Sequence, residues 1–186
     1  MAYEKTIWTD GVTTLSATNM QKIENELSEG WQKIAEQTLA GAVAQVDFAS
    51  IPSGYKEFRL VFEGNNTTTA GNANIIFNND TGDNYLYHTT RLNITPTGNS
   101  SSGSTSLTLF NALADNANRN YCTLTISNTP LRKKLIIGQH SAHLFHYAYG
   151  GMWANVTEEI NKISIKAANG TLLFAIGSRF ALWGCK

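Results

Sequence analysis

The sequence has few charged residues, and neither sign is in excess. Only 15% of its 186 residues are Asp, Glu, Lys or Arg, against about 25% in a typical globular protein. The 14 basic side chains balance the 14 acidic ones. Proteins held to DNA or RNA by neutralising phosphates need a basic surplus, so we expect no nucleic-acid partner. The low charge content predicts a surface that is mainly polar and uncharged.

Cysteines and long apolar runs are also scarce. Cys122 and Cys185 are the only two cysteines; they are too few for a disulfide framework and lack the spacing of a structural zinc site. No apolar run approaches the roughly 18–20 residues that span a bilayer, so we expect no membrane insertion. No apolar stretch follows Met1 to Lys5, so we expect no signal peptide. The apolar fraction of 42% is still sufficient for one core.

The pattern of the sequence changes near residue 40. We predict an N-terminal arm and helix over residues 1–40 and a β-domain over residues 41–186. Ser16 suits a helix N-cap, because its hydroxyl can accept a hydrogen bond from the first turn. The residues predicted to form the apolar face of this helix are Met20, Ile23, Leu27 and Ile34, and Trp31 lies beside it as a further docking residue.

A single helix with one apolar stripe has to bury that stripe against something. Three partners are open: its own domain, further copies of the chain around a symmetry axis, or a different protein. The stripe also fits a short heptad seam, although Gly30 interrupts it. Periodicity alone does not choose among the three.

From residue 42 onward the apolar residues recur with a period of two, which is typical of β-strands. Turn-forming clusters rich in Gly, Pro, Asn and Asp separate the segments. We expect an antiparallel β-sandwich of jelly-roll type, with Thr95–Thr105 as a loop. The predicted strands are Tyr55–Phe62, Ala73–Phe77, Asn84–His88, Ser106–Phe110, Tyr121–Ile126, Lys134–Ile137, His140–Tyr149, Lys162–Lys166, Leu172–Ile176 and Phe180–Trp183.

Signatures of catalysis are missing from the sequence. It contains no G-x-S-x-G elbow and no glycine-rich phosphate loop. Three histidines, His140, His143 and His146, resemble a metal cluster on paper. In a single extended strand, however, their spacing keeps any two of them from meeting one ion. We therefore expect no enzyme activity, no metal site and no cofactor.

The stretch from Phe77 to Tyr85 is the most informative short segment. Its Asn, Asp and Gly residues suit a turn that needs positive φ angles and side-chain caps. The same oxygen-rich residues (78–84) are compatible with a Ca²⁺ loop, but the terminal Glu of an EF-hand is missing. A turn is the favoured interpretation.

Several aromatic and polar residues of the β-region suit carbohydrate binding. Aromatic faces stack on the C–H surfaces of sugars, and Asn or Asp side chains bind their hydroxyls. Each of these residues is also an ordinary sheet residue, so packing is the alternative. The candidate glycan-binding residues are Asp83, Asn84, Tyr85, Tyr87, Tyr147, Tyr149 and Trp153.

Patches along the chain resemble bacteriophage tail, baseplate and appendage proteins. The first is Trp8-Thr9-Asp10-Gly11-Val12-Thr13-Thr14-Leu15, followed by Ala17-Thr18-Asn19 and the predicted helix. The others are Ile51-Pro52-Ser53-Gly54-Tyr55, the segment from Phe77 to Tyr85, and Gly177-Ser178-Arg179-Phe180-Ala181-Leu182-Trp183-Gly184. None of these patches is a catalytic signature.

The resemblance implies a protein of the virion, assembled in the host cytoplasm, in which Trp8 and the helix attach the chain to other virion proteins through residues 1–40. It also implies a homotrimer whose β-domain points outward. We expect this domain to bind bacterial cell-surface polysaccharide. The alternatives are a head or collar decoration protein without a ligand and a carbohydrate-binding module of a larger enzyme system. The position on the particle (tail tip, baseplate, collar or head spike) is left open.

Overall fold

The computed structural model describes residues 30–67, 71–92, 97–113, 120–142, 145–167 and 173–186, and the fold is given for these residues. Trp31–Lys186 form one compact unit. No helix in the described ranges is long and apolar enough to cross a membrane. The strands are β1 (Gln32–Thr38), β2 (Gln45–Phe48), β3 (Glu57–Gly64), β4 (Gly71–Phe77), β5 (Tyr85–Leu92), β6 (Thr97–Ser104), β7 (Leu107–Leu113), β8 (Asn120–Ser127), β9 (Lys134–Ala142), β10 (Phe145–Trp153), β11 (Ile163–Ala167) and β12 (Arg179–Cys185).

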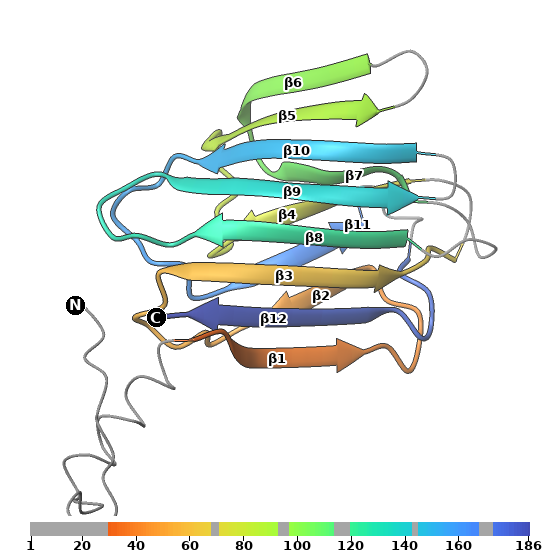
Figure 1. Ribbon diagram of the computed structural model, residues 1–186, viewed down its shortest axis with the longest axis horizontal. Helices are drawn as coiled ribbons and strands as arrows, with labels where there is room; N and C mark the ends of the chain where they lie inside the picture. Colours follow the sequence, from red (N-terminus) through yellow and green to blue (C-terminus); the bar gives the residue numbers. More distant parts are fainter. Residues whose placement is uncertain (1–29, 68–70, 93–96, 114–119, 143–144, 168–172) are drawn as a thin grey trace, which may run out of the picture. The chain divides into compact units, whose positions relative to one another are not determined.

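These strands form two antiparallel sheets packed as a sandwich. The large sheet has eight strands in the order β1-β12-β3-β8-β9-β10-β5-β6, and the small sheet has four in the order β2-β11-β4-β7. In Figure 1 the small sheet lies behind the large one. The predicted antiparallel β-sandwich is confirmed.

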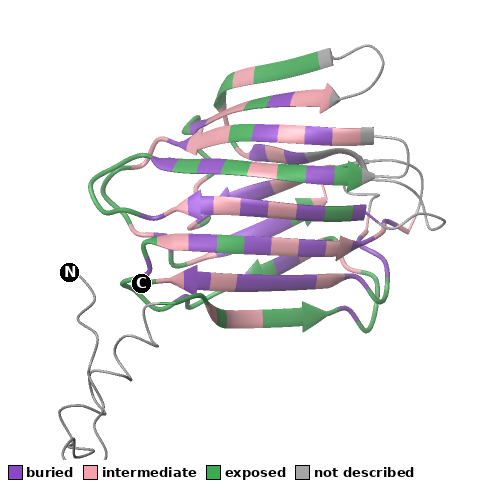
Figure 2. Cartoon of the chain, viewed as in Figure 1, coloured by how far each residue is buried: buried purple, intermediate pink, exposed green. Residues whose placement is uncertain are grey.

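The period-two pattern of the sequence explains why the large sheet has one buried face. Along β3, buried residues alternate with more exposed ones, and Phe58, Leu60 and Phe62 point into the core. The same alternation runs along β8 and is visible in the colours of Figure 2. Burying such a side chain stabilises the fold by about 1.5–3 kcal/mol. The opposite, outer face of the large sheet carries the more exposed residues.

Two aromatic clusters fill the space between the sheets. Phe180 lies between Phe62 and Phe174, with ring centroids 4.7 and 5.2 Å away. At the other end, Trp153 lies 5.5 Å from Phe77 and 6.5 Å from Tyr85. Aromatic pairs at such distances add to the stabilisation from burial.

The predicted helix does not extend through Trp31 and Ile34. Residues Gln32–Thr38 form β1, which pairs with β12 on both sides of a register shift at Ile34. Ile34 packs against the core, beside the space left by Gly184, which has no side chain. The backbone ladder and this burial outweigh the helical spacing of the apolar residues. The rest of the predicted arm and stripe, including Trp8, Met20, Ile23 and Leu27, lies outside the described residues.

One loop prediction and two further strand predictions need correction. Most of the predicted loop Thr95–Thr105 is β6, an edge strand held by backbone pairing with β5. The predicted strand His140–Tyr149 is divided between β9 and β10, which pair with each other. In the described part of Leu172–Ile176, Phe174 makes only isolated bridges, to Val43 and Asn66. β6 and the β9–β10 pair are hairpins between neighbouring segments, whereas Phe174 bridges residues more than 100 positions earlier. Backbone pairing decided each case, and local alternation does not reveal it.

Candidate functional site

Strands β10, β5 and β6 place a row of small and polar residues across the outer face of the large sheet. Gly150 of β10 lies directly opposite Ile137 of β9 on one side and His88 of β5 on the other. His88 in turn lies opposite Ser100 of β6. These positions alternate with inward-facing neighbours, so their side chains share the outer face.

This row of residues forms the floor of a hollow with a volume of about 460 Å³. A Cβ atom added to Gly150 would have no other atom within 4 Å, so the missing side chain leaves open space. Glycine inside a strand commonly marks such a gap or a close approach. The lining residues are Leu86, Tyr87, His88, Ser100, Ser101, Ser102, Gly150, Gly151 and Met152.

The lining combines hydroxyl groups with an apolar wall. Ser100, Ser101 and Ser102 come from β6, whereas Leu86 and Met152 contribute apolar surface from β5 and β10. The imidazole Nε2 of His88 lies 2.9 Å from the hydroxyl of Thr90. The lining contains no carboxylate, lysine or arginine. It can exchange hydrogen bonds with hydroxyl groups and contact apolar C–H surface, which suits an uncharged polar ligand.

Four of the predicted glycan-binding aromatics lie inside the sandwich. Tyr85 and Trp153 are completely buried, and Tyr147 and Tyr149 are only 4% and 7% exposed. All four belong to the inward-facing set of β5 and β10. Their rings therefore offer no open face to a sugar in this structure.

The other three predicted residues lie nearer the surface. Tyr87 is half-buried, packs against the core and lines the hollow. Asp83 and Asn84 are exposed in the turn before β5. The hollow thus joins Tyr87 to residues, such as His88 and Gly150, that the sequence pattern does not mark as glycan-binding. The feature of the sequence that could have indicated these residues is the Gly150-Gly151 pair inside a strand rich in aromatic residues.

Asp80, in the turn between β4 and β5, has its carboxylate surrounded by N–H donors. It accepts hydrogen bonds from the Trp153 indole (2.7 Å), the Asn84 side chain (2.9 Å) and the backbone of Gly82 (2.9 Å). Burial raises the pKa of Asp80, but these hydrogen bonds outweigh it and hold the pKa below its usual value.

The same segment has the geometry of a tight turn. Asn78 and Asn79 both have positive φ angles, and the amide of Asp80 donates to the carbonyl of Phe77 at 2.8 Å. The predicted turn is confirmed. N–H donors directed at a carboxylate oppose a cation there, and within the described ranges no group of three or more His, Cys, Asp or Glu side chains could hold a metal ion.

The single extended strand expected for the histidines is a hairpin, which places His140 and His146 at adjacent positions of the paired strands β9 and β10, where Tyr147 is the register partner of His140. His140 is fully buried on β9, where its Nε2 lies 3.2 Å from the Asn120 side-chain oxygen and its ring stacks on Tyr147. His146 lies on β10 and pairs with the hydroxyl of Ser141. Burial first, and His146 second, lower the pKa of His140 to about 4, so its imidazole is neutral at pH 7. His143 lies outside the described residues.

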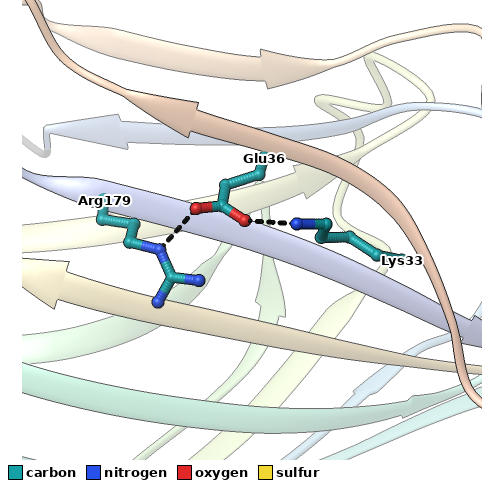
Figure 3. A network of polar contacts seen from close by, with 3 residues as sticks. All are labelled: Lys33, Glu36 and Arg179. Atoms are coloured by element: carbon teal, nitrogen blue, oxygen red, sulfur yellow. Dashed lines mark hydrogen bonds and ion pairs between the residues drawn. The ribbon is translucent and has the colours of Figure 1, made fainter.

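The other end of the outer face carries charge. Glu36 of β1 accepts hydrogen bonds from Arg179 of β12 (2.7 Å) and Lys33 (2.9 Å), as Figure 3 shows. The bonds from Arg179 and Lys33 lower the pKa of Glu36 to about 2. The eight-stranded sheet thus has a charged half around β1 and β12 and an uncharged half around the hollow.

Comparisons with known proteins give no family. No family model and no curated protein matches the sequence. Two solved structures show weak similarity. An endo-β-1,4-glucuronan lyase from the fungus Trichoderma reesei has 12% identity and a TM-score of 0.26, over 78% of this chain and 79% of its own. A variant of the alginate lyase Aly36B in complex with alginate trisaccharide has 10% identity and a TM-score of 0.23, over 76% and 80%. TM-scores this low do not establish a common fold.

Proposed function

We propose that this protein is a non-enzymatic attachment protein of a phage virion and binds an uncharged host-surface glycan in the hollow over Gly150. The hollow carries the proposal. Its volume of about 460 Å³ falls within the range of small-molecule sites, about 300–1,000 Å³. The serine hydroxyls of β6 and the imidazole of His88 can form hydrogen bonds with sugar hydroxyls. Leu86 and Met152 can contact the apolar C–H surface of a pyranose.

The strand order supports a jelly roll as the architecture of the domain. Without the hairpins β5–β6 and β9–β10, the sheets reduce to β1-β12-β3-β8 and β2-β11-β4-β7. Successive strands then change sheet at every connection except that from β4 to β7. Lectin domains and viral capsid proteins use this architecture, although a fold by itself does not define a function. The added hairpins build the hollow.

Attachment to the particle is the second part of the proposal. The resemblance of Trp8 to Leu15 to phage appendage proteins supports a homotrimer and an N-terminal anchor, which is now limited to the residues before Trp31 because Gln32–Thr38 belong to the sandwich as β1. An open hollow of this size makes a weak site for one sugar. Three copies on one axis, and many trimers on one particle, raise the effective affinity without new contacts.

Filling the hollow tests the binding site. The change Gly150→Leu places a side chain in open space, whereas Gly41→Leu makes the same change at an exposed glycine with no atom within 4 Å. Isothermal calorimetry against polysaccharide from the host surface should show binding to the unmodified protein and to Gly41→Leu. Gly150→Leu should bind at least tenfold more weakly. Equal affinity of all three proteins would remove the hollow as the binding site.

Two measurements test the remaining parts. Immunogold labelling should place the protein on intact virions, and light scattering of the full chain should give the mass of a trimer. If the antibody labels the particles but the protein binds no host polysaccharide, the result would favour a decoration protein. A monomer would contradict the proposed assembly.

A further inference from the structure

A second cluster of aromatic and cationic side chains lies on the charged half of the large sheet. The guanidinium carbon of Arg59, on β3, lies 4.5 Å from the centroid of the Trp31 ring. Both side chains are exposed, Trp31 at 37%. Strands β8, β9 and β10 separate β3 from β5 and β6, so this cluster is distinct from the hollow.

A second indole lies beside this pair. Trp183 of β12 is directly opposite Arg59 in the register between β12 and β3. The Lys33 ammonium lies 5.9 Å from the centroid of the Trp183 ring. Two indole rings and two cations therefore gather at β1, β12 and β3, with Trp31 immediately before β1. Trp31 and Arg59 together with Trp183 are called the Arg59 platform below.

Arg59 differs from the neighbouring cations Lys33 and Arg179 in its contacts with carboxylates. Glu36 engages both Lys33 and Arg179 (Figure 3). Glu63 lies opposite Arg179 in the strand register, and Glu57 is two residues from Arg59 on the same face. Within the described ranges no carboxylate forms an ion pair with Arg59, which instead contacts the Trp31 ring.

A guanidinium that lies over an aromatic ring, as that of Arg59 lies over Trp31, is well prepared to bind a carboxylate. Stacking uses the face of the guanidinium and leaves the N–H groups along its edge free. Those N–H groups match the two oxygens of a carboxylate in a bidentate pair. The ring also limits the rotamers of the side chain, so less entropy is lost on binding. An indole nearby supplies apolar surface for sugar C–H groups.

From this geometry we propose that the Arg59 platform binds an acidic saccharide through its carboxylate. The ligand class is a uronate-bearing glycan. The Arg59 guanidinium takes the carboxylate, and Trp31 and Trp183 contact the pyranose ring. The proposal is separate from the site over Gly150, which has no charged lining residue.

A matched pair of probes tests the charge requirement. Oligogalacturonate carries a carboxylate on each sugar, and its methyl ester keeps the sugars without the charge. Calorimetry on the full chain should show binding of oligogalacturonate and at least tenfold weaker binding of the ester. Raising the salt concentration should weaken the binding of oligogalacturonate, because exposed ion pairs are screened. Quenching of tryptophan fluorescence should accompany binding.

Variants then assign the binding to Arg59. Arg59→Gln should weaken binding of oligogalacturonate at least tenfold. Arg59→Lys should weaken it severalfold, because lysine keeps the charge without the planar fork. Trp31→Ala should also weaken it. Lys166→Gln, a change at an exposed cation of the small sheet, should have no effect, and unchanged melting temperatures will verify folding.

Three results would overturn the proposal: no binding of oligogalacturonate, equal binding of the ester, or unchanged binding by Arg59→Gln. The change Gly150→Leu should leave binding of oligogalacturonate intact. A failure at one site therefore remains distinguishable from a failure at the other.

Discussion

The Trp153 indole N–H donates a 2.7 Å hydrogen bond to the carboxylate of Asp80, which lies 73 residues earlier in the sequence. This bond ties the turn between β4 and β5 to the end of β10. The Tyr85 hydroxyl lies 3.0 Å from the backbone carbonyl of Asp80 and reinforces the link. Asp80 thus joins the start of β5 to the end of β10, two of the three strands that line the hollow, through its backbone carbonyl and its carboxylate.

Removal of this carboxylate should destabilise the sandwich. Asp80→Ala leaves the buried Trp153 indole without its acceptor, and we expect a loss of about 2–3 kcal/mol in the free energy of unfolding. Asp83→Ala, at an exposed position of the same turn, should change it by about 0.5 kcal/mol or less. Urea denaturation of the three proteins measures both values. Similar stabilities for the two variants would contradict the structural role of Asp80.

Asp80 also predicts how the protein responds to acid. Its pKa is lowered in the folded state, so the unfolded chain takes up the proton first, near the ordinary pKa of about 3.9. The stabilisation is present above that pH and is lost as the pH falls through the folded value. The pKa of Glu36 is lowered too, and its contribution has the same sign.

The salt dependence of stability distinguishes the contributions of the Asp80 and Glu36 carboxylates. Glu36 and its cations lie at the surface, where ions screen them, whereas the Asp80 carboxylate bonds to a buried indole. Denaturation at pH 3 and pH 6, with and without 0.5 M NaCl, should show a fall in stability at pH 3 that is reduced by Asp80→Ala at both salt concentrations. Glu36→Gln should reduce this fall in stability at low salt only. An acid response that Asp80→Ala leaves unchanged would refute this assignment.

Most of the strands were predictable because their burial is one-sided. In β3 and β8 the alternation of apolar and polar residues matches the two faces of the sheet. β1 was missed, because the same apolar residues also fit a helical period and the partner strand, β12, lies more than 140 residues away. β6 was missed because its Ser and Gly residues give no apolar alternation, and it is held by backbone pairing with β5.

The site was harder to predict than the fold. The alternation along β10 divides its side chains between two faces of the sheet. It does not indicate which of these faces packs against the core, because Tyr and Trp occur on buried and on exposed faces. The structure turns Tyr147, Tyr149 and Trp153 inward and leaves Gly150 outside. The hollow depends on a missing side chain and on the neighbouring residues of β5 and β6. That neighbourhood follows from strand order, which local patterns do not encode.

The glycines of neighbouring strands should respond in opposite ways to a methyl group. A Cβ atom at Gly138 of β9 would collide with the Leu124 side chain and the backbone carbonyl of Thr123. Gly138→Ala should therefore destabilise the fold by about 1–3 kcal/mol. At Gly150 the Cβ meets open space, and Gly150→Ala should be neutral or stabilising by up to about 1 kcal/mol, because alanine restricts the unfolded chain.

Thermal and urea denaturation of both glycine variants test this contrast. Gly41→Ala, in open space outside the sheets, is the control for the effect of alanine on the unfolded chain. Equal losses at Gly138 and Gly150 would mean that the two faces of the sheet are packed alike, against the structure.

His140 predicts a second pH dependence, in a higher range. Its pKa is about 4 in the folded state against 6.5 ordinarily, chiefly because of burial. Between these values the unfolded chain binds the proton and the folded protein does not, so stability falls as the pH falls. From pH 8 to pH 5 this single group should remove about 2 kcal/mol from the free energy of unfolding.

The measurement is urea denaturation across pH 5–8 for the unmodified chain, His140→Phe and His88→Gln. Phenylalanine keeps a ring to stack on Tyr147 but cannot titrate, so His140→Phe should flatten the pH dependence whatever it does to the absolute stability. His88 is exposed, so His88→Gln should retain the full slope. A slope that persists in His140→Phe would show that His140 is not the group responsible, because a neutral ring at that position cannot bind the proton.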